Sequence, residues 1–177
     1  MEWLNPPPDW TVDGPTITAT AGARTDFWRK THDGGIRDTG HFYYQWVNGD
    51  FTTQVKVSGQ YADLYDQAGL MLRLNETHWM KCGIEYLDGV QQASVVVTRD
   101  WSDWSVLPLP NPPAIWLRVD RQGATIEVRF SLDGSQYTLI RQAYLSEAPA
   151  LQVGVMLCAP TGPGFPVIFD DLNTTHR

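Results

Sequence analysis

Aromatic, cationic and acidic residues recur at strand spacing in one stretch of the chain. In the segment Trp79–Tyr86, alternation places Trp79, Lys81 and Glu85 on one face of a strand and the apolar residues between them on the other. Aromatic rings stack on the C–H faces of sugar rings, and planar polar groups then bind the hydroxyls. This spacing therefore predicts a recognition surface, on which we expect Lys81 and Glu85 to form an ion pair.

Further polar and aromatic residues are expected around this centre. Gln67 and Arg73 belong to the preceding strand-like segment, whereas Trp28 and Trp104 belong to polar stretches beside the same face. The competing interpretation is an ordinary solvated ion pair, which contributes little to stability. The predicted ligand-binding residues are Trp28, Gln67, Arg73, Trp79, Lys81, Glu85 and Trp104.

The chain has eight tryptophans, a high number for 177 residues. Trp46 and Trp116 alternate within apolar strand-like segments and are predicted to lie in the core. Trp101 and Trp104 instead stand in a polar, loop-like stretch, where large aromatic side chains need something to pack against. Two interpretations stay open for this pair: a saccharide-binding rim, or a plug at the open end of a sandwich.

The sequence predicts no cofactor. The four histidines are dispersed, no Cys-x-x-Cys pair occurs, and Gly-x-Ser-x-Gly is absent. Calcium bound by loop carboxylates stays open, with Asp63, Asp66, Asp170 and Asp171 as the candidates. No loop carries the ligand density of a strong site, and turn formation or helix capping is the favoured role of these residues. We interpret Cys82 and Cys158 as two reduced thiols in the core. A disulfide between them stays an alternative if their strands are neighbours and the compartment is oxidising.

Net charge narrows the class of partner. The formal charge is −7 and there is no basic cluster, which argues against nucleic acid or an anionic membrane, since both need Lys and Arg to neutralise phosphate. No apolar run approaches the length of about 20 residues that a spanning helix needs. The first residues of the sequence form neither a basic leader nor an apolar stretch, so we expect a cytoplasmic protein or one without its signal segment.

The elements that must position these residues are strands. The dominant period is two, as in Phe51–Ser58, and Gly-containing turns such as Asp88-Gly89 and Asp133-Gly134 separate the segments. About ten short strands predict an all-β sandwich or jelly roll of two antiparallel sheets, in a single domain over residues 1–177. One helical turn is expected at Tyr61–Tyr65.

A family resemblance follows from a set of motifs in a fixed order. These motifs are Thr25–Trp28, Asp66–Arg73, Trp79–Tyr86, Ser94–Thr98, Ser102–Ser105 and Val153–Val155. Together they resemble the DUF1349 family, which includes proteins named for regulation of enolase and belongs to the concanavalin A-like lectin/glucanase superfamily. The resemblance covers essentially the whole chain. It implies a jelly roll of twelve to fourteen strands with a concave sheet, on which relatives in the wider superfamily bind or cut saccharides.

The enzymes of that superfamily offer a residue-level test for catalysis. Concanavalin-like glucanases commonly carry Glu-x-Asp-x-Glu on one strand, because retaining hydrolysis needs two carboxyls roughly 5 Å apart. The corresponding strand here reads Lys81-Cys82-Gly83-Ile84-Glu85, so two of the three acidic positions are lost. A neighbouring cation would also lower the pKa of Glu85, which does not suit a general acid. A partner carboxylate would have to come from elsewhere, such as Asp100 or Glu127.

Three functions remain, in order of preference. The first is a noncatalytic domain that binds a carbohydrate or polyhydroxylated metabolite on the concave sheet face. The second is a regulatory protein-interaction subunit, in which that face or the Trp101–Trp104 stretch docks a protein partner. The third is a glycoside hydrolase. A groove with aromatic walls favours a saccharide, whereas a flat apolar patch favours a protein partner.

Overall fold

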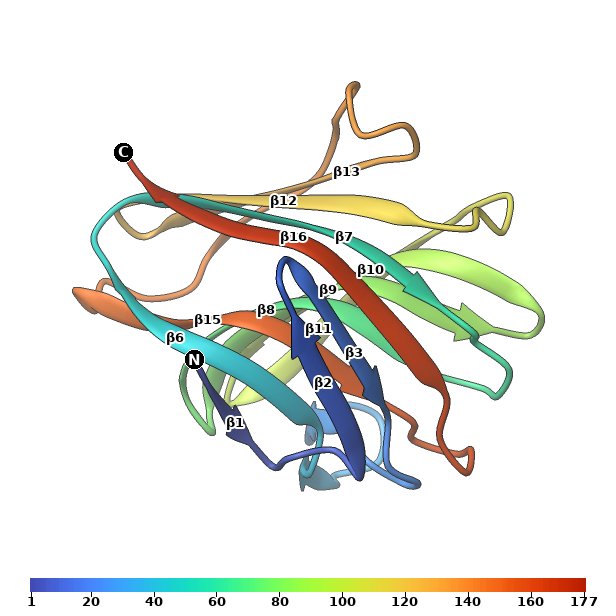
Figure 1. The fold of residues 1–177 in the computed structure, drawn as a ribbon. Coiled ribbons are helices and arrows are strands. Elements are labelled where there is room, and N and C mark those ends of the chain that lie inside the picture. The colour runs from blue at the N-terminus through green and yellow to red at the C-terminus, as the bar shows by residue number, and fades with distance from the viewer.

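The computed structural model describes residues 1–177 and contains sixteen strands and no α-helix. Two antiparallel sheets of seven strands each pack face to face (Figure 1), and a two-stranded hairpin lies outside them. No helix has the length and hydrophobicity that a membrane crossing requires. The prediction of an all-β sandwich of two antiparallel sheets is confirmed.

The first sheet has the spatial order β1 (Glu2–Leu4), β6 (His41–Asn48), β15 (Ala150–Cys158), β8 (Gln67–Asn75), β9 (His78–Leu87), β10 (Val90–Arg99) and β11 (Trp101–Pro108). The second has the order β14 (Thr138–Tyr144), β13 (Thr125–Ser131), β12 (Ile115–Gln122), β7 (Phe51–Gly59), β16 (Pro166–His176), β3 (Thr16–Thr20) and β2 (Asp9–Asp13). The hairpin joins β4 (Phe27–Arg29) to β5 (Ile36–Asp38).

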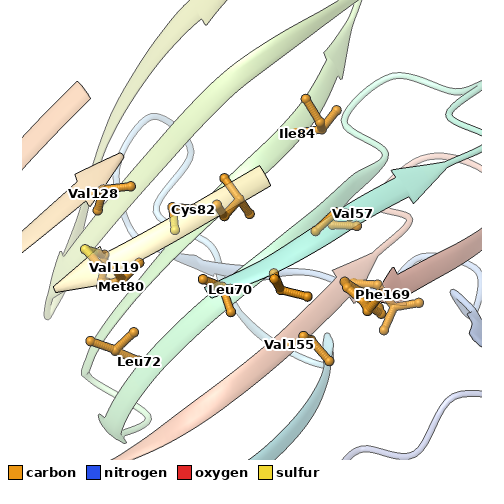
Figure 2. Close-up of a cluster of buried hydrophobic side chains, with 14 of the residues drawn as sticks. Val57, Leu70, Leu72, Met80, Cys82, Ile84, Val119, Val128, Val155 and Phe169 are labelled. Atoms are coloured by element: carbon orange, nitrogen blue, oxygen red, sulfur yellow. The ribbon is translucent and has the colours of Figure 1, made fainter. Parts of the chain in front are cut away.

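The main core lies between the two sheets. Alternation sends every second side chain of the central strands inward, and most of the inward residues are aliphatic or aromatic. Figure 2 shows side chains of both sheets in this layer, among them Leu70, Met80 and Ile84 of the first sheet and Val57, Val119 and Phe169 of the second. Full burial of such a side chain contributes about 1.5–3 kcal/mol, so this layer is the main source of fold stability.

A smaller core covers the outer face of the first sheet. Phe27 of β4 is fully buried there against Trp79 of β9, with ring centroids 6.1 Å apart. Met71, Val96 and Met156 complete the contact with the sheet. The hairpin is therefore held down by apolar packing on the face that points away from the main core.

Three local predictions were wrong. Trp46 is 54% exposed on β6, and Trp116 is only half-buried on the outer face of β12, where Lys56 lies 5.4 Å from its ring centroid. Trp101–Ser105 belongs to the edge strand β11 and is not a loop. The helical turn at 61–65 is a bend and a turn, because the Asp66 carboxylate accepts the backbone N–H groups of the residues at its start.

The two cysteines are free and lie on opposite faces of the first sheet. Cys82 points into the main core, whereas Cys158 belongs to the smaller core beneath the hairpin. Their side chains are separated by the sheet itself. The interpretation as two reduced core thiols fits this arrangement, and the alternative of a bridge between them does not.

Candidate ligand-binding site

Strand β9 forms the floor of the site. Its residues Trp79, Lys81 and Glu85 point to the outer face of the first sheet, while Met80, Cys82 and Ile84 point into the main core. The strand alternation expected from the sequence is therefore the one observed. Gly83 lies between Lys81 and Glu85 on the outer face, and all three residues line a small recess of about 10 Å³.

The segment 25–40, which contains the β4–β5 hairpin, forms one wall of the site. We call it the covering segment, because it covers the outer face of the first sheet. The guanidinium of Arg73 donates to both carboxylate oxygens of Asp38, at 2.7 and 2.8 Å. The backbone N–H of Arg29 donates to the Ser102 hydroxyl of β11 at 2.9 Å. Apolar packing, a bidentate ion pair and links to the edge strand thus attach this segment to the sheet.

Between this segment and β11 the surface is hollowed into a cavity of about 670 Å³, within the size range of small-molecule sites. Polar residues dominate its lining. The lining consists of Asp26, Trp28, Thr31, His32, Asp33, Arg37, Tyr65, Gln67, Lys81, Glu85, Ser102, Asp103, Trp104, Pro160 and Thr161.

Lys81 and Glu85 do not form the ion pair that the sequence predicted. Lys81 is 3% exposed, and its ammonium donates to the Phe27 carbonyl at 2.7 Å and to the Asp26 carboxylate at 3.3 Å. Lys81 therefore pairs with Asp26 in the segment that covers the sheet. A lysine ammonium has three donors, and the covering segment supplies two acceptors that the sequence does not place beside it.

Glu85 is 7% exposed and holds a different set of partners. Its Oε2 accepts hydrogen bonds from the Ser94 hydroxyl at 2.7 Å and from the Trp104 indole N–H at 2.9 Å, while no protein donor reaches Oε1. Burial raises the pKa of the Glu85 carboxyl above its usual range, and the charge of Lys81 and these two hydrogen bonds only partly offset that effect. The expected lowering of the pKa by Lys81 is therefore outweighed by burial.

Gln67 lies directly opposite Glu85 in the β8–β9 ladder. It is 3% exposed, and its Nε2 donates to the Tyr65 carbonyl at 3.2 Å and weakly to Asp26 at 3.4 Å. Its Oε1 accepts no hydrogen bond. Buried amide oxygens are usually satisfied, so this acceptor marks the floor as a place where the protein leaves polar capacity unused.

Three aromatic rings stand above this floor. The ring of Trp104 lies 6.4 Å from that of Trp28, at an interplanar angle of 89°, and 6.5 Å from that of Tyr65, at 74°. Trp28 is fixed by its indole N–H, which donates to the Thr31 carbonyl at 2.7 Å. The rings therefore meet at steep angles and form a corner beside the Glu85 carboxylate.

The structure brings five of the seven predicted site residues to this cavity: Trp28, Gln67, Lys81, Glu85 and Trp104. Trp79 and Arg73 lie outside it. Trp79 is fully buried beneath Phe27, and Arg73 is held by Asp38 with its guanidinium 5.8 Å from the Phe27 ring centroid. Both attach the covering segment to the sheet.

Sequence reasoning missed several lining residues. His32, Asp33 and Arg37 lie in the covering segment, and Tyr65 and Thr161 come from loops distant in sequence. Asp26 belongs to the Thr25–Trp28 motif, so the signal was present there, but nothing in the sequence indicated that its carboxylate reaches Lys81. The described residues contain no group of three or more His, Cys, Asp or Glu side chains that would hold a metal ion.

Comparisons with known proteins place this geometry in context. Over 174 residues the chain is 38% identical to "Regulation of enolase protein 1" of Saccharomyces cerevisiae, covering 98% of this chain and 88% of that protein. A crystal structure of a functionally unknown protein from Saccharomyces cerevisiae superposes with a TM-score of 0.96 at 37% identity, over 99% of this chain and 96% of the other.

More distant structures share the fold alone. A mutant of the GH43 protein BlXynB of Bacillus licheniformis gives a TM-score of 0.72 at 13% identity, over 92% of this chain but 33% of the larger protein. The carbohydrate-binding module CBM66 of Bacillus subtilis gives 0.60 at 9% identity, over 97% and 94% of the two chains. These neighbours bear out the jelly-roll fold class.

The family model described as "Protein of unknown function (DUF1349)" matches residues 3–177. That match covers nearly the whole chain and agrees with the 38% identity to the yeast protein. The chain therefore belongs to the DUF1349 family.

Proposed function

We propose that this chain is a noncatalytic binding domain for a carbohydrate or a similar polyhydroxylated metabolite, held in the cavity above β9. The observation that carries this proposal is a cavity of about 670 Å³ with buried polar residues as its floor and aromatic rings as its wall. Gln67, Lys81 and Glu85 supply hydrogen-bonding groups at the floor. Trp104, Tyr65 and Trp28 supply ring faces and edges against which a sugar ring packs.

The fold is compatible with this use. A carbohydrate-binding module and glycoside hydrolases share the sandwich, although that likeness concerns the fold and does not assign a ligand. Hydrolysis is less well supported. Of the two carboxylates suggested as partners for Glu85, Asp100 pairs with Arg29 and Lys30 and Glu127 lies on β13 of the other sheet, so neither lines the cavity. The three other acids that do line it, Asp26, Asp33 and Asp103, are each paired with a cation, which favours the charged carboxylate.

The test is a glycan-array screen followed by calorimetric titration of each hit against Trp104→Ala. We expect the variant to weaken binding about tenfold, because stacking and the hydrogen bond to Glu85 are both lost. Trp101→Ala is the matched control: this residue lies on the same strand, is 59% exposed and does not line the cavity. Equal effects of the two substitutions, or no hit on the array, would count against the proposal.

A protein-interaction role is the second candidate, and a different surface favours it. Trp101, Val106 and Leu107 are exposed on β11, which is the unpaired edge of the first sheet. Exposed apolar edge strands are sites of pairing with other chains. Because the yeast relative is named for regulation of enolase, purified enolase is the partner to test by size-exclusion chromatography, with Trp101→Ala expected to reduce association.

A further inference from the structure

The acidic residues that line the cavity differ in whether a cation lies beside them. Four acids line it, and three of them lie within 4 Å of a cation: Asp26 beside Lys81 at 3.3 Å, Asp103 beside Arg141 at 3.2 Å, and Asp33 beside Arg37. Glu85 is the exception. Its two hydrogen-bond donors are the neutral Ser94 hydroxyl and Trp104 indole, and both bind Oε2.

The cations of the lining are already engaged. Lys81 is buried against Asp26 and the Phe27 carbonyl, and Arg37 is paired with Asp33. Neither Lys81 nor Arg37 therefore offers an anionic ligand a cation without an acidic partner, and the remaining basic side chain of the lining is His32. A cationic ligand would find a carboxylate whose Oε1 has no protein donor, at the floor of a cavity large enough to hold it.

The aromatic corner formed by Trp28, Tyr65 and Trp104 also favours a cationic ligand over an anionic one. The faces of Trp and Tyr rings attract cations, most strongly when the site is shielded from water. Trp104 meets Trp28 and Tyr65 at 89° and 74°, so ring faces are presented in more than one direction. The indole N–H of Trp104 donates to Glu85, which fixes the ring beside the carboxylate.

A second feature points to a donor-rich ligand. Gln67 lies opposite Glu85 in the strand ladder, is buried, and has an Oε1 that no protein group satisfies. Gln67, Glu85, Ser94 and Lys81 also line the small recess beneath the cavity. The floor thus holds two neighbouring side chains with unused acceptor capacity.

We propose that the cavity selects a polyhydroxylated ligand that carries a protonated amine, such as an amino sugar with a free amino group. The ammonium binds Glu85 at Oε1 beside the Trp104 ring, and the sugar ring packs in the aromatic corner. This inference rests on the proposed saccharide-binding function and names the chemical class of its ligand.

The test uses three tetrasaccharides with the same β-1,4 backbone, made of glucosamine, N-acetylglucosamine or glucose, which differ only at C2. Binding to the full chain is measured by calorimetry at low salt, at a pH where the amine of glucosamine is protonated. We expect the glucosamine tetrasaccharide to bind about tenfold more tightly than the other two, a preference within the range of a shielded cation–aromatic contact. Butylammonium serves as an amine without hydroxyls.

The outcomes separate the two proposals. Equal binding of all three tetrasaccharides overturns the amine preference and supports saccharide binding. Binding of butylammonium but of none of the saccharides overturns both the amino-sugar ligand and the proposed saccharide function, and leaves a site for simple amines. Absence of binding by every probe overturns the inference.

Glu85→Gln tests the residue that carries the inference. Gln keeps an acceptor for Ser94 and Trp104 but removes the charge, so the preference for the glucosamine tetrasaccharide over the glucose tetrasaccharide should disappear in this variant. Glu147→Gln is the control, because it makes the same charge change at an exposed position outside the cavity. A tenfold preference retained in Glu85→Gln would overturn the assignment. If that variant does not fold, competition between butylammonium and the glucosamine tetrasaccharide on the unmodified chain decides, and simultaneous binding of both overturns it.

Discussion

Lys81 and Glu85 share the outer face of β9 with only Gly83 between them, yet their charged groups have separate partners. The ammonium binds Asp26 and the Phe27 carbonyl, and the carboxylate accepts from Ser94 and Trp104. One residue therefore attaches the covering segment to the sheet, whereas the other keeps an acceptor at the cavity floor. Lys81 therefore holds the site together, whereas Glu85 is available to bind a ligand.

The first prediction concerns the attachment. Lys81→Ala should lower the free energy of unfolding by about 3 kcal/mol, because it leaves the Asp26 carboxylate without its cation in a mostly buried position. Adding Asp26→Asn should restore part of the loss, since the uncompensated charge is then removed. Urea unfolding of the single and double variants measures both effects.

Lys56→Ala provides the control for that substitution. Lys56 lies 4.0 Å from Asp170 and is more than a third exposed, so its loss should cost less than about 1 kcal/mol. Equal destabilisation by the two Lys→Ala variants would show that the Lys81–Asp26 pair does not hold the segment.

The second prediction is a pH dependence. Because burial raises the pKa of Glu85, the folded protein keeps this proton to a higher pH than the unfolded chain does. The resulting stabilisation is complete below the ordinary glutamate pKa of about 4.3 and is lost as the pH rises through the folded-state value. From pH 4 toward neutrality, the unmodified chain should therefore lose stability relative to Glu85→Gln.

Urea unfolding at several pH values, with Glu147→Gln as the exposed control, measures this difference. Asp66 also has a pKa raised by burial, but it is present in all three proteins and cancels in the comparison. A stability difference between the unmodified chain and Glu85→Gln that stays constant with pH would contradict the assigned burial of this carboxyl.

Strand alternation predicted much of the fold and part of the site. It assigned the outward direction of Trp79, Lys81 and Glu85 correctly, because the side chains between them are apolar and must face a core. It missed β11, since that strand lies at an edge, is exposed along most of its length and lacks an alternating pattern. Local patterns report which side of a strand is buried and fail where neither side is.

Strand alternation could not predict which residues the site residues contact. Lys81 and Asp26 are 55 positions apart in sequence, and their contact depends on how the segment 25–40 folds back over the sheet. The same fold-back covers Trp79 and Arg73, which the sequence placed on the binding face. Alternation therefore predicts which face of a strand a side chain lies on, but not whether a segment distant in sequence covers that face.

The third prediction concerns Arg73. Arg73→Lys should keep the charge but lose the two-pronged contact with Asp38, which we expect to cost roughly 1–2 kcal/mol. Because Arg73 lies outside the cavity, ligand binding should change only through loosening of the segment 25–40. Hydrogen exchange should then be faster in β4 and β5 than in the unmodified chain and unchanged in β12. Uniform acceleration over both sheets would instead indicate global destabilisation without a specific effect on the hairpin.

The last prediction follows from the position of the thiols. Cys82 and Cys158 are buried on opposite faces of the first sheet, and burial raises the pKa of the Cys82 thiol to about 12. Only the thiolate reacts readily with a disulfide reagent, so both groups should be inert in the folded protein. Titration with such a reagent should detect neither thiol under native conditions and both in denaturant, without prior reduction. Detection of neither thiol in denaturant would mean that they had paired, which would require the two faces of the sheet to be arranged differently.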